Sequence, residues 1–261
     1  MTGIPVSSAE SKDAATVPVK ARRWLKSLLP HSARHLYHLS RLVARAGWDR
    51  LFWMLHYLGE EQGHFRSCEA GACVAQNGEP IPWYTYPAIE YLRNLDLRDA
   101  RVFEYGAGNS SLFWAARTKH THSIEDSPEW YAKVRSGSPP NHTLLLKTEE
   151  RDYVSAIQEA VTPFDVIIVD GKYRMSCAAK AIEHLAPGGF ILLDNSDWHP
   201  RTAEKLRDAG LIQIDFTGAG PLNAYAWTTS LFLSPGFRPR PRRGDLPGHN
   251  VGTLVQVANP E

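Results

Sequence analysis

Hydrophobic positions after residue 100 fall into short apolar runs that alternate with helical patterns. The runs predict strands at 101–105, 122–125, 143–147, 164–169 and 189–193, with helices at 110–117, from Ser127 onward, and at 152–161, 175–185 and 200–209. Runs this short and apolar indicate βαβ units in a parallel sheet that is covered on both faces. Two further runs, 211–216 and 226–233, have a Gly/Pro loop and no helix between them, which predicts an antiparallel pair at one edge. The predicted fold class is α/β, a Rossmann-like doubly wound sheet of seven strands with an antiparallel strand at its C-terminal edge.

The pattern before residue 81 is helical. Leu36, Leu39, Leu42 and Val43 recur at helical spacing with arginines on the other faces, which predicts an amphipathic helix. A second apolar segment runs from residue 48 to 58. Such an apolar stripe either docks on the core of its own protein, as most do, or lies on an anionic membrane surface.

Charge is nearly balanced overall but uneven along the chain. Lys and Arg number 29 against 28 Asp and Glu, a formal charge of +1, which excludes a generally basic nucleic-acid coat and a polyacidic disordered chain. Residues 20–50 hold eight Lys/Arg and one Asp, so they carry +7 and the remainder carries 1 − 7 = −6. We therefore expect no nucleic-acid substrate, and peripheral membrane contact through residues 20–50 stays open as an alternative.

The ends of the chain and its cysteines complete the predicted organisation. Residues 1–19 lack an apolar run and are interpreted as a disordered leader, 20–80 as a basic helical cap, 81–234 as the main domain and 235–261 as an extended, exposed Pro/Arg-rich tail. No apolar run approaches the length of a spanning helix. Three cysteines fit a reducing compartment, so we expect a cytoplasmic protein. His64, Cys68 and Cys73 offer too few ligands for a zinc site and are interpreted as an ordinary histidine and thiols.

Glycines and a carboxylate mark a ligand site at the start of the α/β region. Gly106 and Gly108 follow the first predicted strand, where glycine allows a tight turn and close approach to a ligand, and Asn109 or Ser110 is predicted to cap the next helix. Glu125 ends the second strand, where a carboxylate can accept hydrogen bonds from both hydroxyls of a ribose. Ser111 replaces the third glycine of the dinucleotide fingerprint, which disfavours a dehydrogenase.

Four segments, 103–110, 123–126, 164–171 and 185–195, together with the terminal strand pair, resemble the class I S-adenosylmethionine-dependent methyltransferases, among them poorly characterised bacterial members. The resemblance implies S-adenosyl-L-methionine as cofactor, with the glycine loop facing its methionine part and Glu104 helping to hold its amino end. The implied cofactor-binding residues are Glu104, Gly106, Ala107, Gly108, Asn109, Ser110, Glu125, Asp126 and Asp170.

Acidic and imidazole side chains at the later strand ends are the candidates for catalysis. Asp170 is the first candidate for a base or for orienting the acceptor, and His199 is the second. Asp170 with Asp194 and Asn195 is similar to the divalent-metal site of catechol-type methyltransferases, so Mg is considered. The alternative is that Lys172 and Arg174 pair with these carboxylates, and no metal ligand is assigned.

The reaction expected from this resemblance is in-line methyl transfer to a hydroxyl of a small molecule or saccharide. Oxygen is favoured by the acidic strand ends and by the absence of an Asn/Asp-Pro-Pro-aromatic signature. The aromatic segment 82–87 is interpreted either as a lid over the site or as core packing. Two other functions stay open: a non-catalytic binding protein that docks through its basic N-terminal helices, and another transferase on the same scaffold, such as an aminopropyl transferase.

Overall fold

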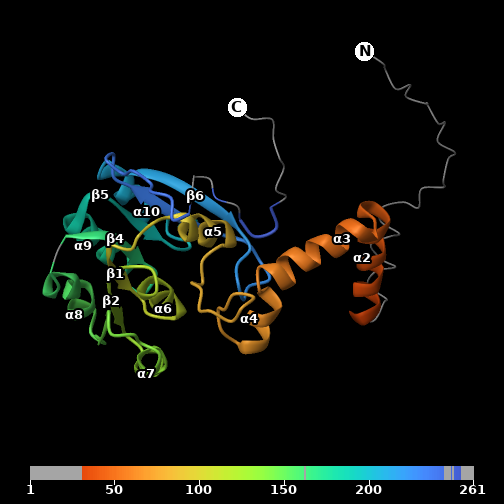
Figure 1. The fold of residues 1–261 in the computed structure, drawn as a ribbon, viewed down its shortest axis with the longest axis horizontal. Helices are drawn as coiled ribbons and strands as arrows, with labels where there is room; N and C mark the ends of the chain where they lie inside the picture. Colours follow the sequence, from red (N-terminus) through yellow and green to blue (C-terminus); the bar gives the residue numbers. More distant parts are fainter. Residues whose placement is uncertain (1–30, 162, 244–247, 249, 254–261) are drawn as a thin grey trace, which may run out of the picture. The chain divides into compact units, whose positions relative to one another are not determined.

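The computed structural model describes residues 31–161, 163–243, 248 and 250–253. The leader 1–19, the basic residues 20–30 and the end of the tail therefore lie outside the described residues. The chain divides into two compact units, 1–53 and 54–261, the first described from His31 onward. Figure 1 shows the elements of both.

The first unit is helical. Helix α2 spans His31–Ala46, and after Gly47 helix α3 spans Trp48–Leu55, of which Trp48–Trp53 belong to this unit. Helix α2 confirms the helix that was predicted from the spacing of the leucines. Leu36, Leu39 and Leu42 are exposed by 67%, 40% and 52%.

The second unit is built on a seven-stranded sheet with the order β3-β2-β1-β4-β5-β7-β6. Its strands are β1 Arg101–Tyr105, β2 His120–Glu125, β3 His142–Leu146, β4 Phe164–Val169, β5 Leu185–Leu193, β6 Ile212–Gly218 and β7 Trp227–Leu233. Strands β1 to β5 pair in parallel, while β7 is antiparallel to both β5 and β6. The predicted Rossmann-like sheet is confirmed, with the detail that β6 forms the edge and β7 is inserted beside it.

Helices cover both faces of this sheet (Figure 1). They are α5 Tyr86–Asn94, α6 Asn109–Ala115, α7 Pro128–Ser136, α8 Glu150–Ser155 with η2 Ala156–Glu159, α9 Arg174–His184 and α10 Pro200–Asp208. Two shorter helices, η1 His56–Glu61 and α4 His64–Ala70, precede them in the chain and contact each other. Alternate residues of the central strand β4 face opposite sides, as the period of a strand requires. Val166 and Ile168 join the core under α5 and α6, whereas Ile167 and Val169 join the core under α8, α9 and α10.

Strand register brings the carboxyl ends of four strands to one edge. Tyr105 is level with Ile124 on β2 and with Val169 on β4, and Val169 is level with Leu193 on β5. The residues that follow each strand must therefore meet at this edge, where open α/β sheets bind ligands.

Several boundaries differ from the prediction for local reasons. Strand β5 begins at Leu185, because Leu185 pairs with Phe164 before a shift in register. The helix predicted at 152–161 is shorter, since α8 ends at Ser155 and continues as a 3-10 turn. None of the helices in the described residues has the length and apolar content needed to cross a bilayer.

The beginning of the Pro/Arg-rich tail is extended, as predicted, but it is also attached to the domain. The backbone N–H of Asp96 donates to the carbonyl of Arg240 at 2.8 Å, and that of Arg242 donates to the carbonyl of Asn94 at 2.8 Å. Leu95 and Pro241 form an isolated antiparallel bridge between these bonds. The sequence could not predict this pairing because proline-rich composition indicates only an extended backbone.

Candidate functional site

A glycine turn closes the end of β1 against the end of β4. Gly106 has φ +94°, a left-handed conformation that favours glycine. A Cβ at this position would lie 2.7 Å from the Cα of Gly171, the second residue after β4. The turn therefore depends on glycine both for its conformation and for close backbone contact.

Helix α6 begins at Asn109, one residue before the predicted start of the helix. Gly108 is the N-cap, so the assignment of this role to Asn109 or Ser110 is wrong. The Asn109 side chain instead donates to the carbonyl of Cys73 at 2.7 Å and ties the glycine loop to a distant segment. The Ser111 hydroxyl accepts from the Gly108 N–H at 3.1 Å, and Ser110 is buried.

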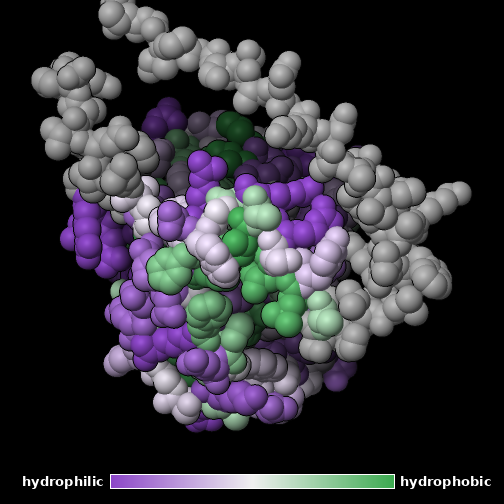
Figure 2. All heavy atoms as spheres, turned by 90° about the vertical axis from the view of Figure 1, so that its right-hand side faces the viewer, coloured by the Kyte–Doolittle hydropathy of each residue, from purple (hydrophilic) through white to green (hydrophobic). Residues whose placement is uncertain are grey.

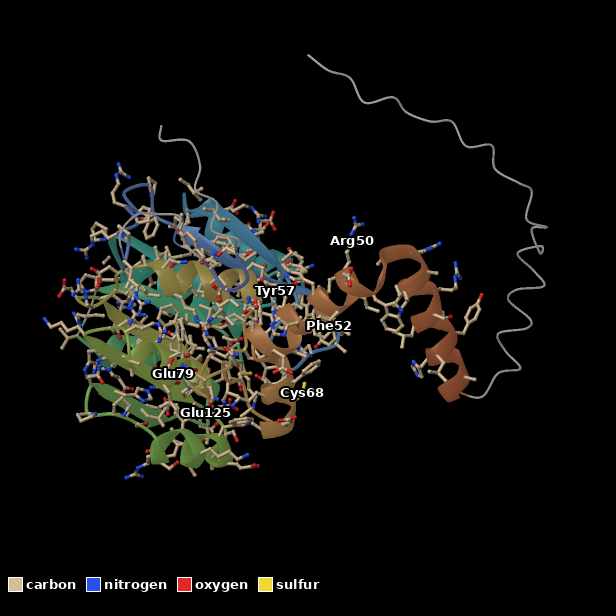
Figure 3. The ribbon with its side chains drawn as sticks, turned by 45° about the vertical axis from the view of Figure 1, so that its right-hand side comes forward. Arg50, Phe52, Tyr57, Cys68, Glu79 and Glu125 are labelled. Atoms are coloured by element: carbon tan, nitrogen blue, oxygen red, sulfur yellow. The ribbon has the colours of Figure 1, made fainter. Side chains whose placement is uncertain are left out.

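Glu125 joins the glycine loop to the start of α7. Its Oε2 accepts from the backbone N–H of Ala107 and its Oε1 from that of Ser127, both at 2.9 Å. The side chain, labelled in Figure 3, is buried, and burial raises its pKa while these backbone N–H groups oppose the rise. Each carboxylate oxygen has a second lone pair, so Glu125 keeps the capacity to accept two further hydrogen bonds.

Glu104, on β1, is a buried carboxyl with one unused oxygen. Its Oε2 accepts from the hydroxyls of Ser111 at 2.5 Å and Ser123 at 2.6 Å. Its Oε1 is buried and has no hydrogen-bond partner among the described residues. Burial raises the pKa of Glu104 to about 7, against the opposing effect of serine hydroxyls. An unsatisfied buried carboxyl oxygen is costly, which makes it a site for a hydrogen-bond donor from a ligand.

Asp126 differs from Glu125 in its surroundings. Its carboxylate accepts a hydrogen bond from the Nζ of Lys172, which lies in the loop after β4 and is mostly exposed. This ion pair links the ends of β2 and β4. A cofactor-binding role for Asp126 stays a prediction.

Arg174 holds the ends of β4 and β5 together. Its Nη2 donates to the carboxylate and the carbonyl of Asp170, each at 3.1 Å, and its Nη1 donates to Asn195 Oδ1 at 3.1 Å and to the carbonyl of Asp194. Burial and the nearby Asp194 raise the pKa of Asp170 well above its usual range, although Arg174 opposes the rise. Asp170 is thus a carboxyl whose proton affinity is increased at the edge where the strand ends meet.

The residues at this edge do not fit a divalent cation. Arg174 places a positive guanidinium on Asp170, which satisfies this carboxylate and repels a second cation. Asp194 Oδ1 already accepts from Trp227 Nε1 at 3.1 Å and Thr229 Oγ1 at 2.5 Å. Burial raises the pKa of Asp194 to about 6, against the opposing effect of these two hydrogen bonds. The expectation of Mg is therefore not supported.

His199 caps helix α10 with its backbone and leaves its imidazole for other contacts. The residue is the N-cap, but its side chain makes no capping hydrogen bond. Burial, and then the charge of Arg174, lower its pKa, so the ring is neutral at pH 7. A neutral imidazole can accept a proton. The structure brings both catalytic candidates within the electrostatic influence of Arg174.

Aromatic rings extend outward from Asp194. Trp227 is buried, and its ring centroid lies 6.0 Å from that of Tyr225, which in turn lies 6.2 Å from Trp198. Tyr225 and Trp198 are 52% and 57% exposed, with ring planes inclined by 33°. The pair offers two exposed rings, of which Trp198 directly precedes His199 in the chain.

Tyr84 and Cys73 were not among the predicted site residues. Burial raises the pKa of the Tyr84 phenol well above its usual range, and the charges of Glu104 and Asp170 add to the effect. Cys73 responds similarly, its pKa being raised to about 12 by burial and then by Asp170 and Asp194. Both therefore lie near the carboxylates. The signal in the sequence was the aromatic segment 82–87, whose tyrosines are buried as core packing rather than as a lid, while Trp83 is 44% exposed.

Comparisons with known proteins were made by sequence and by structure. No protein-family model and no curated protein sequence matches the chain. Among solved structures, precorrin-6Y C5,15-methyltransferase from Geobacter metallireducens GS-15 is similar, with 14% identity and a TM-score of 0.46 over 63% of this chain and 96% of that chain. The precorrin-8W decarboxylase of Methanobacterium thermoautotrophicum is similar with 16% identity and a TM-score of 0.42, covering 59% and 92%. The N-methyltransferase NodS of Bradyrhizobium japonicum WM9, in complex with S-adenosyl-L-homocysteine, is similar with 14% identity and a TM-score of 0.39, covering 53% and 79%.

The fold follows from the topology of the chain itself. Five parallel strands run in the order β3-β2-β1-β4-β5, and β7 is inserted antiparallel between β5 and the edge strand β6. Gly106 directly follows β1, and Glu125 is the last residue of β2. The chain therefore has a Rossmann-like, doubly wound fold that ends in an antiparallel strand pair.

Proposed function

We propose that this protein is an S-adenosylmethionine-dependent methyltransferase that transfers the methyl group to a hydroxyl of a small molecule or saccharide. One observation carries the proposal. Two buried carboxyls flank the glycine turn, Glu104 with an unused oxygen and Glu125 with unused lone pairs on both oxygens. Such a pair matches a ligand that presents a cationic amine at one end and a ribose diol at the other.

The described residues fit the cofactor at these two positions. Glu125 would accept hydrogen bonds from the ribose hydroxyls, and Glu104 Oε1 would accept one from the amino end. Gly108 leaves the backbone of the loop open, since a Cβ there would meet only the Ser110 hydroxyl at 3.8 Å, and this openness suits close approach of a ligand. The cofactor, when bound, supplies a sulfonium methyl that is already activated.

The remaining work of the protein is to orient the acceptor and to remove its proton. Asp170 has a raised pKa and is held in position by Arg174, so it suits both tasks. His199 is neutral at pH 7 and is the second candidate for the base. In either assignment Arg174 stabilises the site electrostatically, because its charge acts on both residues.

The exposed rings support a hydroxyl-bearing acceptor with a flat face. The rings of Trp198 and Tyr225 are inclined by 33°, and Trp198 directly precedes His199 in the chain. Exposed aromatic faces stack on sugar rings and on planar aromatic acceptors. Both classes carry the hydroxyl that the proposal requires.

Calorimetric titration with S-adenosylmethionine tests the cofactor assignment, with S-adenosylhomocysteine and NADH as comparators. We expect both methionine-derived ligands to bind and NADH to show no binding. Glu125→Gln keeps the side-chain shape but weakens its acceptor capacity, and we expect a loss of affinity of at least tenfold. Glu129→Gln, an exposed carboxylate on α7 that pairs with Lys133, serves as the control and should leave affinity unchanged.

Turnover then separates an enzyme from a binding protein. The protein is incubated with methyl-labelled cofactor and a panel of saccharides and phenols, and the label is located by mass spectrometry. Label on a hydroxyl oxygen supports the proposal. Cofactor binding without transfer to any acceptor favours the non-catalytic function, and transfer to nitrogen or carbon overturns the assignment to oxygen.

A further inference from the structure

The first unit carries an amphipathic helix whose two faces differ sharply. At 100° per residue, Leu42, Leu39, Val43 and Leu36 fall within one third of the circumference of α2. Arg41 and Arg45 fall on the opposite side. The helix therefore presents an apolar stripe and a cationic stripe along the same length.

The leucines of this stripe are exposed. Leu36, Leu39 and Leu42 are 67%, 40% and 52% exposed, and Trp48, the first residue of α3, is 67% exposed. Figure 2 shows one face of the molecule, on which apolar surface is bordered by hydrophilic surface. Apolar exposure of this kind along one helix marks an interaction surface.

The charge on the same segment is strongly positive. Residues 20–50 carry +7, and the described helices contribute Arg41, Arg45 and Arg50 to it. Arg50 points away from α3 on the side opposite to Phe52 (Figure 3). The partner must therefore offer both an apolar phase and negative charge at its boundary. A nucleic acid offers the charge but no apolar phase, whereas an anionic lipid surface offers both.

We propose that α2 and the start of α3 form a peripheral anchor that lies in the surface of an anionic phospholipid membrane. The leucine stripe enters the acyl boundary, Trp48 sits at the level of the headgroups, and Arg41 and Arg45 contact the lipid phosphates. At about 1.5 Å per residue the 16 residues of α2 span roughly 24 Å. This length suits a helix in the plane of the interface rather than one across it. The anchor is independent of methyl transfer and would stand if the proposed reaction were wrong.

The test is co-sedimentation of the full chain with vesicles of phosphatidylcholine alone or mixed with phosphatidylglycerol. We expect binding to the anionic vesicles and little binding to the neutral ones, with a decrease as salt is raised. Arg41→Gln with Arg45→Gln should weaken partitioning about 25-fold, at roughly a factor of five per arginine. Leu36→Ser with Leu39→Ser and Leu42→Ser should abolish it.

Matched variants on the second unit control for charge and apolarity. Arg151→Gln with Arg201→Gln removes the same charge, and Val161→Ser with Ile212→Ser removes exposed apolar side chains. Neither pair should change vesicle binding. Equal loss in the controls, or equal binding to neutral vesicles, overturns the proposal.

Two further measurements test the alternatives, in which the leucine stripe contacts protein rather than a membrane. If the leucine variant melts at a clearly lower temperature and the wild type does not bind vesicles, the stripe packs against the chain itself. Size-exclusion chromatography with light scattering tests for a dimer. If the wild type is a dimer, the leucine variant is a monomer and neither protein binds vesicles, the stripe joins two copies. Either result overturns the membrane anchor.

Discussion

Replacing Glu104 by Gln tests the electrostatics of the site in the free protein. The substitution keeps the size of the side chain and removes its titration. Burial raises the pKa of Glu104 to about 7 from an ordinary value of 4.5. Because the folded state holds the proton more tightly than the unfolded state, Glu104 contributes stability that is fully present below pH 4.5 and is lost as the pH rises through 7.

The size of the effect follows from these two values. A shift from 4.5 to about 7 corresponds to a loss of roughly 2–3 kcal/mol between about pH 5 and pH 8. The glutamine variant lacks this loss. Urea unfolding of both proteins at pH 5 and pH 8 should therefore show that the variant gains roughly 2–3 kcal/mol relative to the wild type over this interval. Other carboxyls, such as Asp170 and Asp194, titrate in both proteins, and their contributions largely cancel in the difference.

The same substitution should weaken cofactor binding, although it removes the loss of stability at high pH. An amino group binds a carboxylate more strongly than a neutral amide, so Glu104→Gln should bind S-adenosylmethionine at least tenfold more weakly at pH 8. The wild type should also lose affinity as the pH falls below 7, whereas the variant should lose little. A difference in unfolding free energy that is the same at pH 5 and pH 8 would refute the reasoning about burial. Unchanged cofactor affinity would refute the assignment of the amino end to Glu104.

Three further predictions concern the turn at Gly106, the contacts of Arg174 and the effect of magnesium. Gly106→Ala should destabilise the protein by about 2–4 kcal/mol in urea unfolding, because it adds both φ strain and a Cβ 2.7 Å from Gly171. Gly210→Ala, with φ +82° and nothing within 4 Å of the added Cβ, should cost only about 1 kcal/mol, and equal costs would contradict the close contact. Arg174→Gln should destabilise by about 2–4 kcal/mol and lower turnover at saturating cofactor, measured by unfolding and by methyl transfer, and a variant with normal turnover would exclude Arg174 from the site. Methyl transfer should proceed at the same rate with excess chelator and with added magnesium, and a rate that depends on magnesium would show that our account of Arg174 is wrong.

The sheet could be predicted from the sequence because its signal is local. Each strand is a short apolar run, and the helix between two strands forces them to be parallel. The antiparallel pairing of β6 with β7 was also predictable, since a loop without a helix joins them. The insertion of β7 between β5 and β6 was not predicted, because an antiparallel pair joined by a loop does not itself show which of its strands lies next to β5.

The candidate site was predicted less completely because much of it depends on contacts between distant segments. Glu125 was predicted from its position at the end of the second strand, and Glu104 was implied by the resemblance to the methyltransferases. The bond from Asn109 to the carbonyl of Cys73 joins segments 36 residues apart, so its spacing carries no signal. The cap of α6 was assigned wrongly for the same reason: the Asn109 amide, a good capping group by type, is engaged elsewhere.

The choice between a metal and an arginine at the strand ends shows what side-chain placement adds. Asp170, Asp194 and Asn195 are equally compatible with both by residue type, and the sequence left both open. Helix α9 decides between them, because its first residue is Arg174 and its start lies just beyond the end of β4. From there one guanidinium reaches both strand ends and meets Asp170 at 3.1 Å. The positive charge that a cation would have supplied is thus part of the chain, and under the proposed function Asp170 or His199 would take the proton of the acceptor hydroxyl beside this charge.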